Sequence, residues 1–249
     1  RTLSKRQMPS AARALALAGP IRQALSLVAD ALEGTGAFEP RTATRTFVLA
    51  ASDYTEYVVL PPLLRRLGAV APKVRVEVRP WGLHEAPPGL ETGEIDLMLG
   101  YYGALPAGYR DERLFEEEYV CIVRRNHPRV RRRLTLEQYV ALAHVLVSQR
   151  AGSPGSVDRA LARRGRTRAV GARVSHFLMV PHLVAQTDMV AALSRRIAEP
   201  AARALPLVLH TPPLALPRST VGQVWHARTD SDPASVWFRG VVRDVCQAV

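Results

Sequence analysis

Two pairs of polar residues, Ser52 with Asp53 and Ser175 with His176, stand where an apolar, strand-like segment gives way to a helix-like segment. The first backbone N–H groups of a helix lack partners within the helix, and the helix dipole adds partial positive charge there. Ligands of open α/β sheets collect at such strand ends. We therefore expect the two helix starts to face each other and to hold a carboxylate or phenolate between them. Asp53 argues against an anion, because its own carboxylate can satisfy a helix start and repel the ligand.

Further side chains are expected to complete this site. The walls should come from aromatic residues that follow predicted strands or helix starts, namely Tyr101, Tyr102 and Phe177. The rim should come from the glycine-containing loop that begins at Ser148, in which Arg150 can pair with an anionic ligand. Each residue also has a purely structural interpretation. The serines can act as helix caps alone, the tyrosines can cover the end of a sheet, and His176 can be a core histidine.

An enzymatic function is not expected, because no catalytic constellation is visible. The sequence has no phosphate-binding glycine loop, no pair of metal ligands on one helix face, and no nucleophile beside an evident base. Glu116, Glu117 and Glu118 are consecutive, and we expect them to be exposed charges beside a strand. Cys121 and Cys246 are predicted to be buried thiols rather than a disulfide. No cofactor and no metal is expected.

The chain has 249 residues, of which 47% are hydrophobic, and a formal net charge of +12. No apolar run approaches the roughly 18 residues that a membrane span needs, and the first residues lack the apolar core of a signal peptide, so we expect a cytoplasmic protein with no membrane partner. Arginine outnumbers lysine heavily, a bias typical of GC-rich genes. The densest arginine cluster, from Arg124 to Arg133, lacks interleaved aromatic residues, and a solvated face is favoured over a DNA contact.

The segment from Ser10 to Leu32 has apolar residues at helical spacing. They form one narrow seam that includes Ile21, Leu25, Val28 and Leu32. A seam of this length requires a partner, so we predict a dimerising helix and a homodimer or homotetramer. Pro20 should kink this helix. The residues up to 44 then form a connector.

From Arg45 onward, strand patterns alternate with helix patterns. Thr46–Ala51 is predicted as a strand that leads into a helix capped by Ser52, and alternating valines from Val74 and the apolar run from Ile95 to Leu99 predict two more strands. This order indicates a parallel sheet with helices on its faces. A second unit with the same order follows from Tyr119, and Asp232 and Pro233 should open a final helix. The fold class is therefore α/β, with parallel-rich sheets.

One N-terminal run and six segments that follow it in a fixed order resemble one known family, the LysR-type transcriptional regulators. They are PSAARALALAGPIRQALSLVADAL, RTFVLAASDYTEYVVLPPLLRRLGAVAPKVRVEVRP, ETGEIDLMLG, RLFEEEYVCIVRRNHP, LTLEQYVALAHVLVS, VSHFLMVPHLVAQTDMVAAL and QVWHARTDSDPASVWFRGVV. The first resembles the linker helix of these regulators, and the others resemble their effector-binding domain. The family's N-terminal winged helix-turn-helix, which reads DNA, has no counterpart here.

This resemblance implies a two-lobed, periplasmic-binding-protein-like fold with an effector between the lobes. It predicts a linker helix and connector at residues 1–44, a first lobe at 45–120 and 221–249, and a second lobe at 121–220. It is nearest to the branch that senses aromatic acids and flavonoid-like inducers, and it carries ligand contacts over to Ser52, Tyr101, Tyr102 and His176. A further polar contact of that branch would fall near Pro154, so the effector here should differ. DNA would be bound only through the missing N-terminal domain.

Three functions follow as hypotheses. The first is the effector-sensing domain of a transcription factor, in which a small organic effector controls transcription through lobe closure or subunit packing. The second is a stand-alone solute-binding protein for a transporter, which the lack of an export signal and the dimer-type helix disfavour. The third is a small transferase or isomerase, which the missing catalytic residues disfavour.

Overall fold

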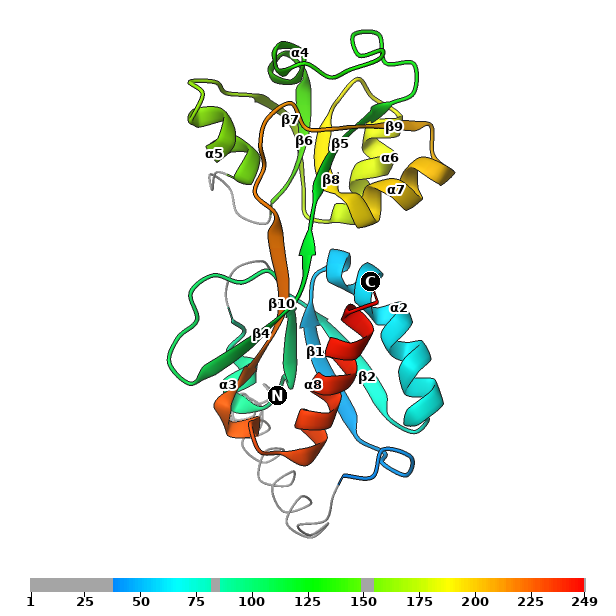
Figure 1. Ribbon diagram of the computed structural model, residues 1–249, viewed down its shortest axis with the longest axis vertical. Coiled ribbons are helices and arrows are strands. Elements are labelled where there is room, and N and C mark those ends of the chain that lie inside the picture. The colour runs from blue at the N-terminus through cyan, green and yellow to red at the C-terminus, as the bar shows by residue number, and fades with distance from the viewer. Residues whose placement is uncertain (1–37, 82–85, 149–154, 249) are drawn as a thin grey trace, which may run out of the picture.

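The computed structural model describes residues 38–81, 86–148 and 155–248, and these form two lobes joined by extended strands (Figure 1). The predicted dimerising helix, with Ile21, Leu25, Val28 and Leu32, lies outside the described residues, and so does Arg150. The first lobe contains one five-stranded sheet in the order β2-β1-β3-β10-β4. The second lobe contains a three-stranded sheet, β8-β5-β9, and a two-stranded sheet, β6-β7. This is the two-lobed α/β architecture that the sequence predicts.

The first lobe begins with the predicted strand and helix. Its strands are β1 (Thr46–Ala51), β2 (Arg75–Pro80), β3 (Leu97–Gly100), β4 (Tyr109–Glu117) and β10 (Ser219–His226). The first three pair in parallel, and helix α2 (Asp53–Val70) connects β1 to β2. The Ser52 hydroxyl accepts the N–H of Thr55, so Ser52 is the N-cap of α2 as predicted. The short helix α3 (Gly89–Thr92) precedes β3.

The strand β4 is an element that the sequence pattern did not reveal. It pairs with β10 along the whole of β10, in antiparallel register, and forms an edge of the sheet. Its sequence, YRDERLFEE, consists largely of charged residues, which are unfavourable for a half-buried strand. Long-range pairing with β10 outweighs this local preference, and an edge position leaves most of the charged side chains in water, with Glu117 at the end of the strand as the buried exception.

The second lobe has the predicted elements with a different pairing. Its strands are β5 (Tyr119–Arg124), β6 (Ala143–Val147), β7 (Ala169–Val174), β8 (Ala191–Ser194) and β9 (Leu207–His210). Its helices are α4 (Leu136–Ala141), α5 (Ser156–Ala162), α6 (Val180–Ala185) and α7 (Arg195–Ala204). Only β6 and β7 pair in parallel, whereas β5 is antiparallel to β8 and β9. Local patterns predict where strands lie but leave their partners open. The expected parallel pairing is therefore found in β6-β7, whereas the β8-β5-β9 sheet is antiparallel.

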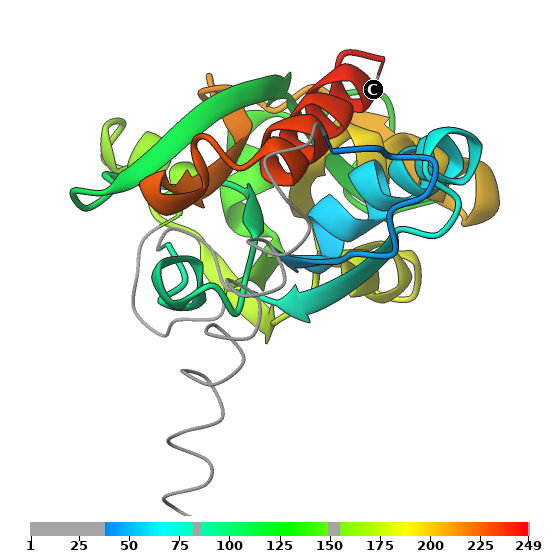
Figure 2. The same ribbon diagram turned by 90° about the horizontal axis from the view of Figure 1, so that it is seen from below.

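Helix α8 (Pro233–Cys246) closes the first lobe. Asp232 accepts the N–H of Ser235, and Pro233 is the first helical residue, as predicted. The helix contacts α2, and the two lie side by side when viewed from below (Figure 2). The ring of Phe238 stacks on Phe47 of β1 with centroids 4.0 Å apart. Stacked rings add stabilisation beyond the burial of their area, so this contact fixes α8 on the sheet.

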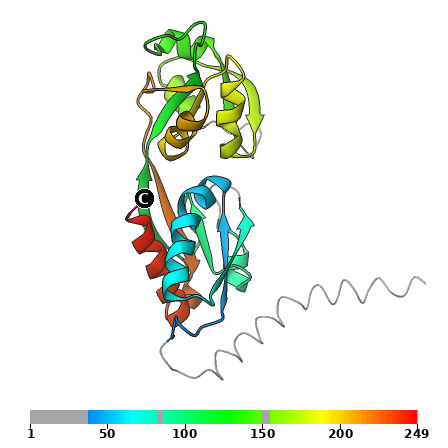
Figure 3. The ribbon, with the colours of Figure 1, turned by 90° about the vertical axis from the view of Figure 1, so that its right-hand side faces the viewer.

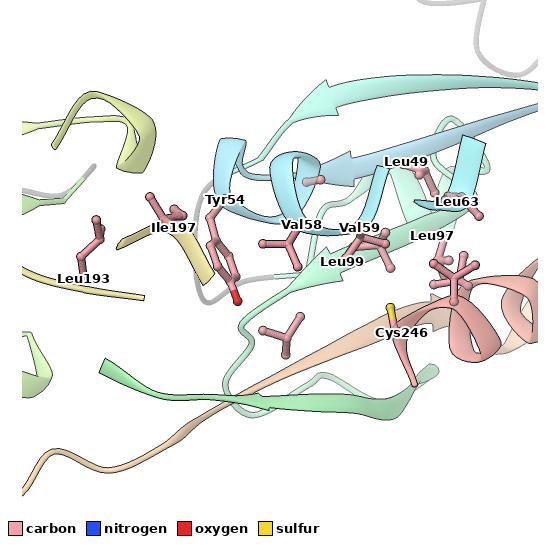
Figure 4. Close-up of a cluster of buried hydrophobic side chains, with 14 of the residues drawn as sticks. Leu49, Tyr54, Val58, Val59, Leu63, Leu97, Leu99, Leu193, Ile197 and Cys246 are labelled. Carbon is pink, nitrogen blue, oxygen red and sulfur yellow. The ribbon is translucent and has the colours of Figure 1, made fainter. Parts of the chain in front are cut away.

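One continuous cluster of buried apolar side chains extends from the first lobe into the second (Figure 4). Tyr54 at the start of α2 lies next to Ile197 of the second lobe, and Leu193 lies beyond Ile197 (Figure 4). Both cysteines, Cys121 and Cys246, are buried free thiols, as expected. In the described part of the chain, no helix is long and apolar enough to cross a membrane.

Among the described residues of the second lobe, two histidines are buried, His127 and His144, and both ring nitrogens of His144 have partners. Its Nε2 lies 2.8 Å from the carbonyl oxygen of Tyr139, and its Nδ1 lies 3.3 Å from a guanidinium nitrogen of Arg168. Since arginine only donates, Nδ1 accepts and Nε2 carries the proton. Arg168 in turn pairs with Asp158 at 2.7 Å. Burial lowers the pKa of His144 to about 4, and the charge of Arg168 acts in the same direction.

This histidine makes the stability of the protein dependent on pH. In the unfolded chain His144 takes up a proton near pH 6.5, whereas in the folded protein it does so only near pH 4. The unfolded state therefore binds more protons between these values, and acidification should reduce the free energy of unfolding by up to about 3 kcal/mol. His144→Gln should flatten this dependence in urea titrations between pH 7 and pH 5. The exposed His182→Gln serves as control, and identical pH slopes for both variants and the wild type would contradict the assignment.

Candidate functional site

The start of α2 and the start of a short 3₁₀ turn, η1 (Phe177–Met179), meet between the lobes. The Asp53 carboxylate accepts the backbone N–H of Leu178 at 2.9 Å, so one helix start is bound directly to the other. Figure 3 shows the connecting strands on one side of the molecule and the start of α2 facing the second lobe. The structure thus brings together the two strand-to-helix junctions that the sequence singled out. The expected role of Asp53, to satisfy a helix start, is also what the geometry shows.

Ser175 and His176 lie just before η1, and both are exposed. His176 is the residue immediately before the turn, with extended backbone, and its side chain makes no cap hydrogen bond. Burial and the negative charge of Asp53 raise the pKa of Glu56 in α2, whereas the nearby His176 lowers it. His176 of the second lobe therefore lies near Glu56 in the first turn of α2. Ser52 on the opposite side is buried, and its hydroxyl lies 3.1 Å from that of Thr55, which makes it a helix cap.

Three aromatic rings stand together beside this junction. Tyr101 and Tyr54 are stacked, with centroids 5.7 Å apart and an interplanar angle of 12°. Phe177 of the second lobe lies on Tyr54 at 6.0 Å with a tilt of 60°. Tyr101 and Phe177 were expected in the site, but Tyr54, which connects them, was not. Tyr54 follows the capping Ser52 by two residues, so it lies in the first turn of α2. This position could have identified it as a candidate site residue from the sequence.

Tyr102 and Ser148 take other positions. Tyr102 packs against a separate apolar cluster, and its hydroxyl donates to Asp111 at 2.7 Å, so it points away from Tyr101. The backbone N–H of Ser148 donates to the carbonyl of Val174, which ties the end of β6 to the end of β7. Arg150 lies outside the described residues. Adjacent residues after a strand alternate in direction, which explains why only one of the two tyrosines reaches the junction.

Glu117 corrects the expectation that three consecutive glutamates would be exposed. Its side chain is fully buried, whereas Glu116 is exposed. The hydroxyl of Tyr54 donates to Oε2 of Glu117 at 2.5 Å, and the backbone N–H of Glu118 donates to Oε1 at 2.9 Å. Successive side chains of a strand point to opposite faces, so Glu117 alone is directed inward. This alternation was the signal that the sequence interpretation missed.

The partner of Glu117 in the second lobe is Arg196, near the start of α7. Its guanidinium lies 3.2 Å from Oε2 of Glu117 and also donates to the backbone carbonyl of Glu116 at 3.1 Å. Burial, together with the hydrogen bond to Glu117, raises the pKa of Tyr54, so its hydroxyl remains a donor. Tyr54, Glu117 and Arg196 therefore form one buried polar network across the two lobes.

A cavity of about 500 Å³ lies elsewhere. It is lined by the connection from Thr211 to Arg218, by the hinge residues Glu118 and Tyr119, and by Arg164 and Arg195. Two of its arginines are paired, because Arg195 and Arg218 each contact Glu118. Among the described residues, no group of three or more His, Cys, Asp or Glu side chains is placed to hold a metal ion.

Comparisons with known proteins give a consistent result. Residues 40–247 match the family described as LysR substrate binding domain. The HTH-type transcriptional activator NagR from a Ralstonia species is 33% identical over 226 residues, which are 91% of this chain and 75% of NagR. NahR from Pseudomonas putida, also an HTH-type transcriptional activator, is 32% identical over 92% of this chain and 76% of its own length.

Solved structures agree with these matches. A probable transcriptional regulator from Pseudomonas aeruginosa superposes with a TM-score of 0.83 at 34% identity, over 93% of this chain and 77% of its own. The regulatory domain of MexT, a transcriptional activator of the same organism, gives a TM-score of 0.72 at 32% identity and covers 82% of this chain and 99% of its own. Both likenesses extend over the two lobes.

Removal of the charge of Glu117 should destabilise the protein. Glu117→Gln weakens the charge-assisted hydrogen bonds that Glu117 accepts from Tyr54 and from the part-exposed Arg196, and a loss of about 2 kcal/mol is expected. Glu116→Gln is the matched control, because Glu116 pairs with Arg218 in a fully exposed setting, where an ion pair adds little to stability. Urea unfolding of both variants measures the difference. Equal free energies of unfolding for the two variants would contradict a stabilising role of the contacts that Glu117 makes with Tyr54 and Arg196.

Proposed function

This chain belongs to the LysR family as a substrate-binding domain, and on that premise we propose that it senses a small organic effector, an aromatic acid or another carboxylate, between its two lobes. Binding of the effector would control transcription by the regulator. The names of the relatives, transcriptional activators, support this proposal over a stand-alone solute-binding protein.

The contact of Asp53 with Leu178 is the observation that supports the site most directly. A carboxylate of the protein itself accepts a backbone N–H at the start of η1, in a place where the carboxylate of a ligand can make the same bond. The rings of Tyr101, Tyr54 and Phe177 beside it offer faces against which an aromatic body can pack. His176 is exposed and near enough to contribute a donor.

A mechanism follows from this geometry. An acidic effector competes with Asp53 for the N–H of Leu178, so its binding replaces one direct contact between the lobes by a contact through the ligand. The balance of lobe orientations then shifts by the difference in effector affinity between them. Within this proposal, catalysis has no role, and Ser52 and Ser175 act by shaping the two helix starts.

The remaining parts of the proposal concern organisation. We assign the first lobe to residues 45–120 and 221–249, the second lobe to 121–220, and the linker and connector to 1–44. The apolar seam with Ile21, Leu25, Val28 and Leu32 would join subunits into a dimer or tetramer. We place the protein in the cytoplasm, with access to the DNA that it regulates.

A thermal-shift screen tests the proposal. The chain is heated with benzoate, 4-hydroxybenzoate and cinnamate, and separately with hexanoate and succinate. A ligand at 100 times its dissociation constant stabilises the folded state by about 2.7 kcal/mol, so at least one aromatic acid should raise Tm by several degrees. A shift with hexanoate or succinate alone would retain a carboxylate site and exclude an aromatic one. Absence of any shift at millimolar concentrations of all five acids counts against the proposed function.

Two substitutions should change the affinity for such an acid in opposite directions. His176→Ala removes an exposed donor and should weaken binding about tenfold while leaving Tm unchanged. Asp53→Asn keeps an acceptor for the N–H of Leu178 but removes the negative charge, and should strengthen binding of a carboxylate about tenfold. Isothermal calorimetry measures both. An unaltered affinity in either variant removes that residue from the site.

A further inference from the structure

The positive charge of this protein is concentrated in one lobe. Residues 121–220 contain seventeen arginines and four acidic residues, whereas residues 38–120 together with 221–249 contain twelve basic and sixteen acidic residues. A bias of the genome toward arginine codons acts on both lobes alike and explains the choice of arginine over lysine. It does not explain why one lobe is strongly basic and the other slightly acidic.

Many of these arginines lie at the end of the second lobe farthest from the hinge. Strand β5 leaves the hinge and ends at Arg124, and the connection from β5 to α4 carries five exposed arginines, Arg125, Arg129, Arg131, Arg132 and Arg133. The connection from α5 to β7 carries three more, Arg163, Arg164 and Arg166, of which Arg164 is directed inward, to the carbonyl of Pro213 and the cavity described above. Strands β6 and β7 run in parallel, with Ala143 beside Ala169, so the segments that precede them share one end of the sheet. Figure 1 shows both connections at that end. We call the arginines of these two connections, apart from Arg164, the distal face.

The carboxylates near the distal face are mostly committed to other arginines. Asp188 pairs with Arg124 at 2.6 Å, and Asp158 pairs with Arg168. Within the described part of the chain, no ion pair joins Arg131, Arg132 or Arg133 to a carboxylate. The distal face thus presents guanidinium groups whose charge the neighbouring carboxylates leave unbalanced.

The character of the face distinguishes between classes of polyanion. The two connections contain no aromatic residue, and their large apolar residues, Val130 and Leu134, are buried. Protein interfaces usually need exposed aromatic or apolar anchors, and single-stranded nucleic acids are bound by stacking on aromatic rings. Arginines alone suit phosphate groups, to which they donate in a bidentate manner, and such contacts carry no sequence information.

We propose that the distal face binds the phosphate backbone of double-stranded DNA without reading its sequence. The proposal rests on the proposed function in one respect, the identity of the polyanion that a transcriptional regulator meets. It departs from the expectation that DNA is contacted only through an N-terminal domain, and from the preference for a merely solvated face. Contacts of this kind add affinity and orient the second lobe along the duplex.

The experiment measures binding of the 249-residue chain to a fluorescent 30-base-pair duplex of mixed sequence by anisotropy, between 20 and 200 mM salt. Affinity should fall steeply with salt, because each phosphate contact contributes about 0.9 to the slope of log K against log salt. The variant Arg131→Gln, Arg132→Gln, Arg133→Gln should bind about tenfold more weakly at the lowest salt, with a slope smaller by about 2 to 3.

The matched control is Arg65→Gln, Arg66→Gln, Lys73→Gln, which removes the same charge from exposed residues of the first lobe. It should bind DNA within about twofold of the unaltered chain. Equal weakening by the two triple variants would reduce the effect to net charge and overturn the proposal, as would absence of binding at 20 mM salt. Poly-L-glutamate that competes as well as unlabelled duplex would point to an acidic protein partner instead, and would also overturn it.

Tm and the thermal shift with acids are recorded for both triple variants. Unchanged values show that the distal face acts apart from the inter-lobe site. A chain that binds DNA through the distal face but responds to no acid would refute the proposed effector site and leave this inference standing.

Discussion

The arrangement of the two lobes depends on a buried carboxylate, that of Glu117. A charged group removed from water costs several kcal/mol unless partners compensate for the lost hydration. Here the compensation comes from three places: Tyr54 at the start of α2, the backbone at Glu118, and Arg196 in α7 of the second lobe. Because one of these partners belongs to the other lobe, any motion that withdraws α7 leaves a buried charge with too few donors. Lobe motions that keep this contact as a pivot are therefore favoured over motions that open it.

The second contact between the lobes has a different character. The hydrogen bond from Leu178 to Asp53 joins a neutral donor on an exposed residue to a half-buried carboxylate, and water or a ligand can take either place. Two contacts between the lobes thus differ in kind: the Glu117–Arg196 pair is costly to break, whereas water or a ligand can replace the Leu178–Asp53 hydrogen bond. Tyr54 lies beside both contacts. Its hydroxyl binds Glu117, while its ring lies between Tyr101 and Phe177. A molecule that shifts Phe177 or Tyr101 therefore acts on the same side chain that helps to balance the buried charge.

The sequence predicted what depends on neighbours in the chain and missed what depends on pairing. Ser52, Asp232 and Pro233 are local signals of helix starts, and all three have their predicted roles. The sequence also predicted that the two helix starts face each other, because this arrangement depends on the general geometry of strand ends. By contrast, β4 is held by its long register with β10, and the antiparallel partners of β5 are distant in sequence. Glu117 was misjudged because three like residues were treated as one group, although a strand divides them between two faces.

The uneven charge of the lobes favours binding of both proposed ligands, the acidic effector and double-stranded DNA, and the two ligands do not compete for one place. A basic second lobe attracts acids toward the junction and DNA toward the distal face, since a field of this size raises the encounter rate of any anion. The two places are separated by the length of β5, six residues or about 20 Å. Exposed charges are screened over about 8 Å at physiological ionic strength, so phosphates at the distal face have little effect on the affinity of an acid beside Asp53. Any influence of DNA on the effector must then pass through lobe orientation, and the Glu117 network is the part of the structure that resists such a change.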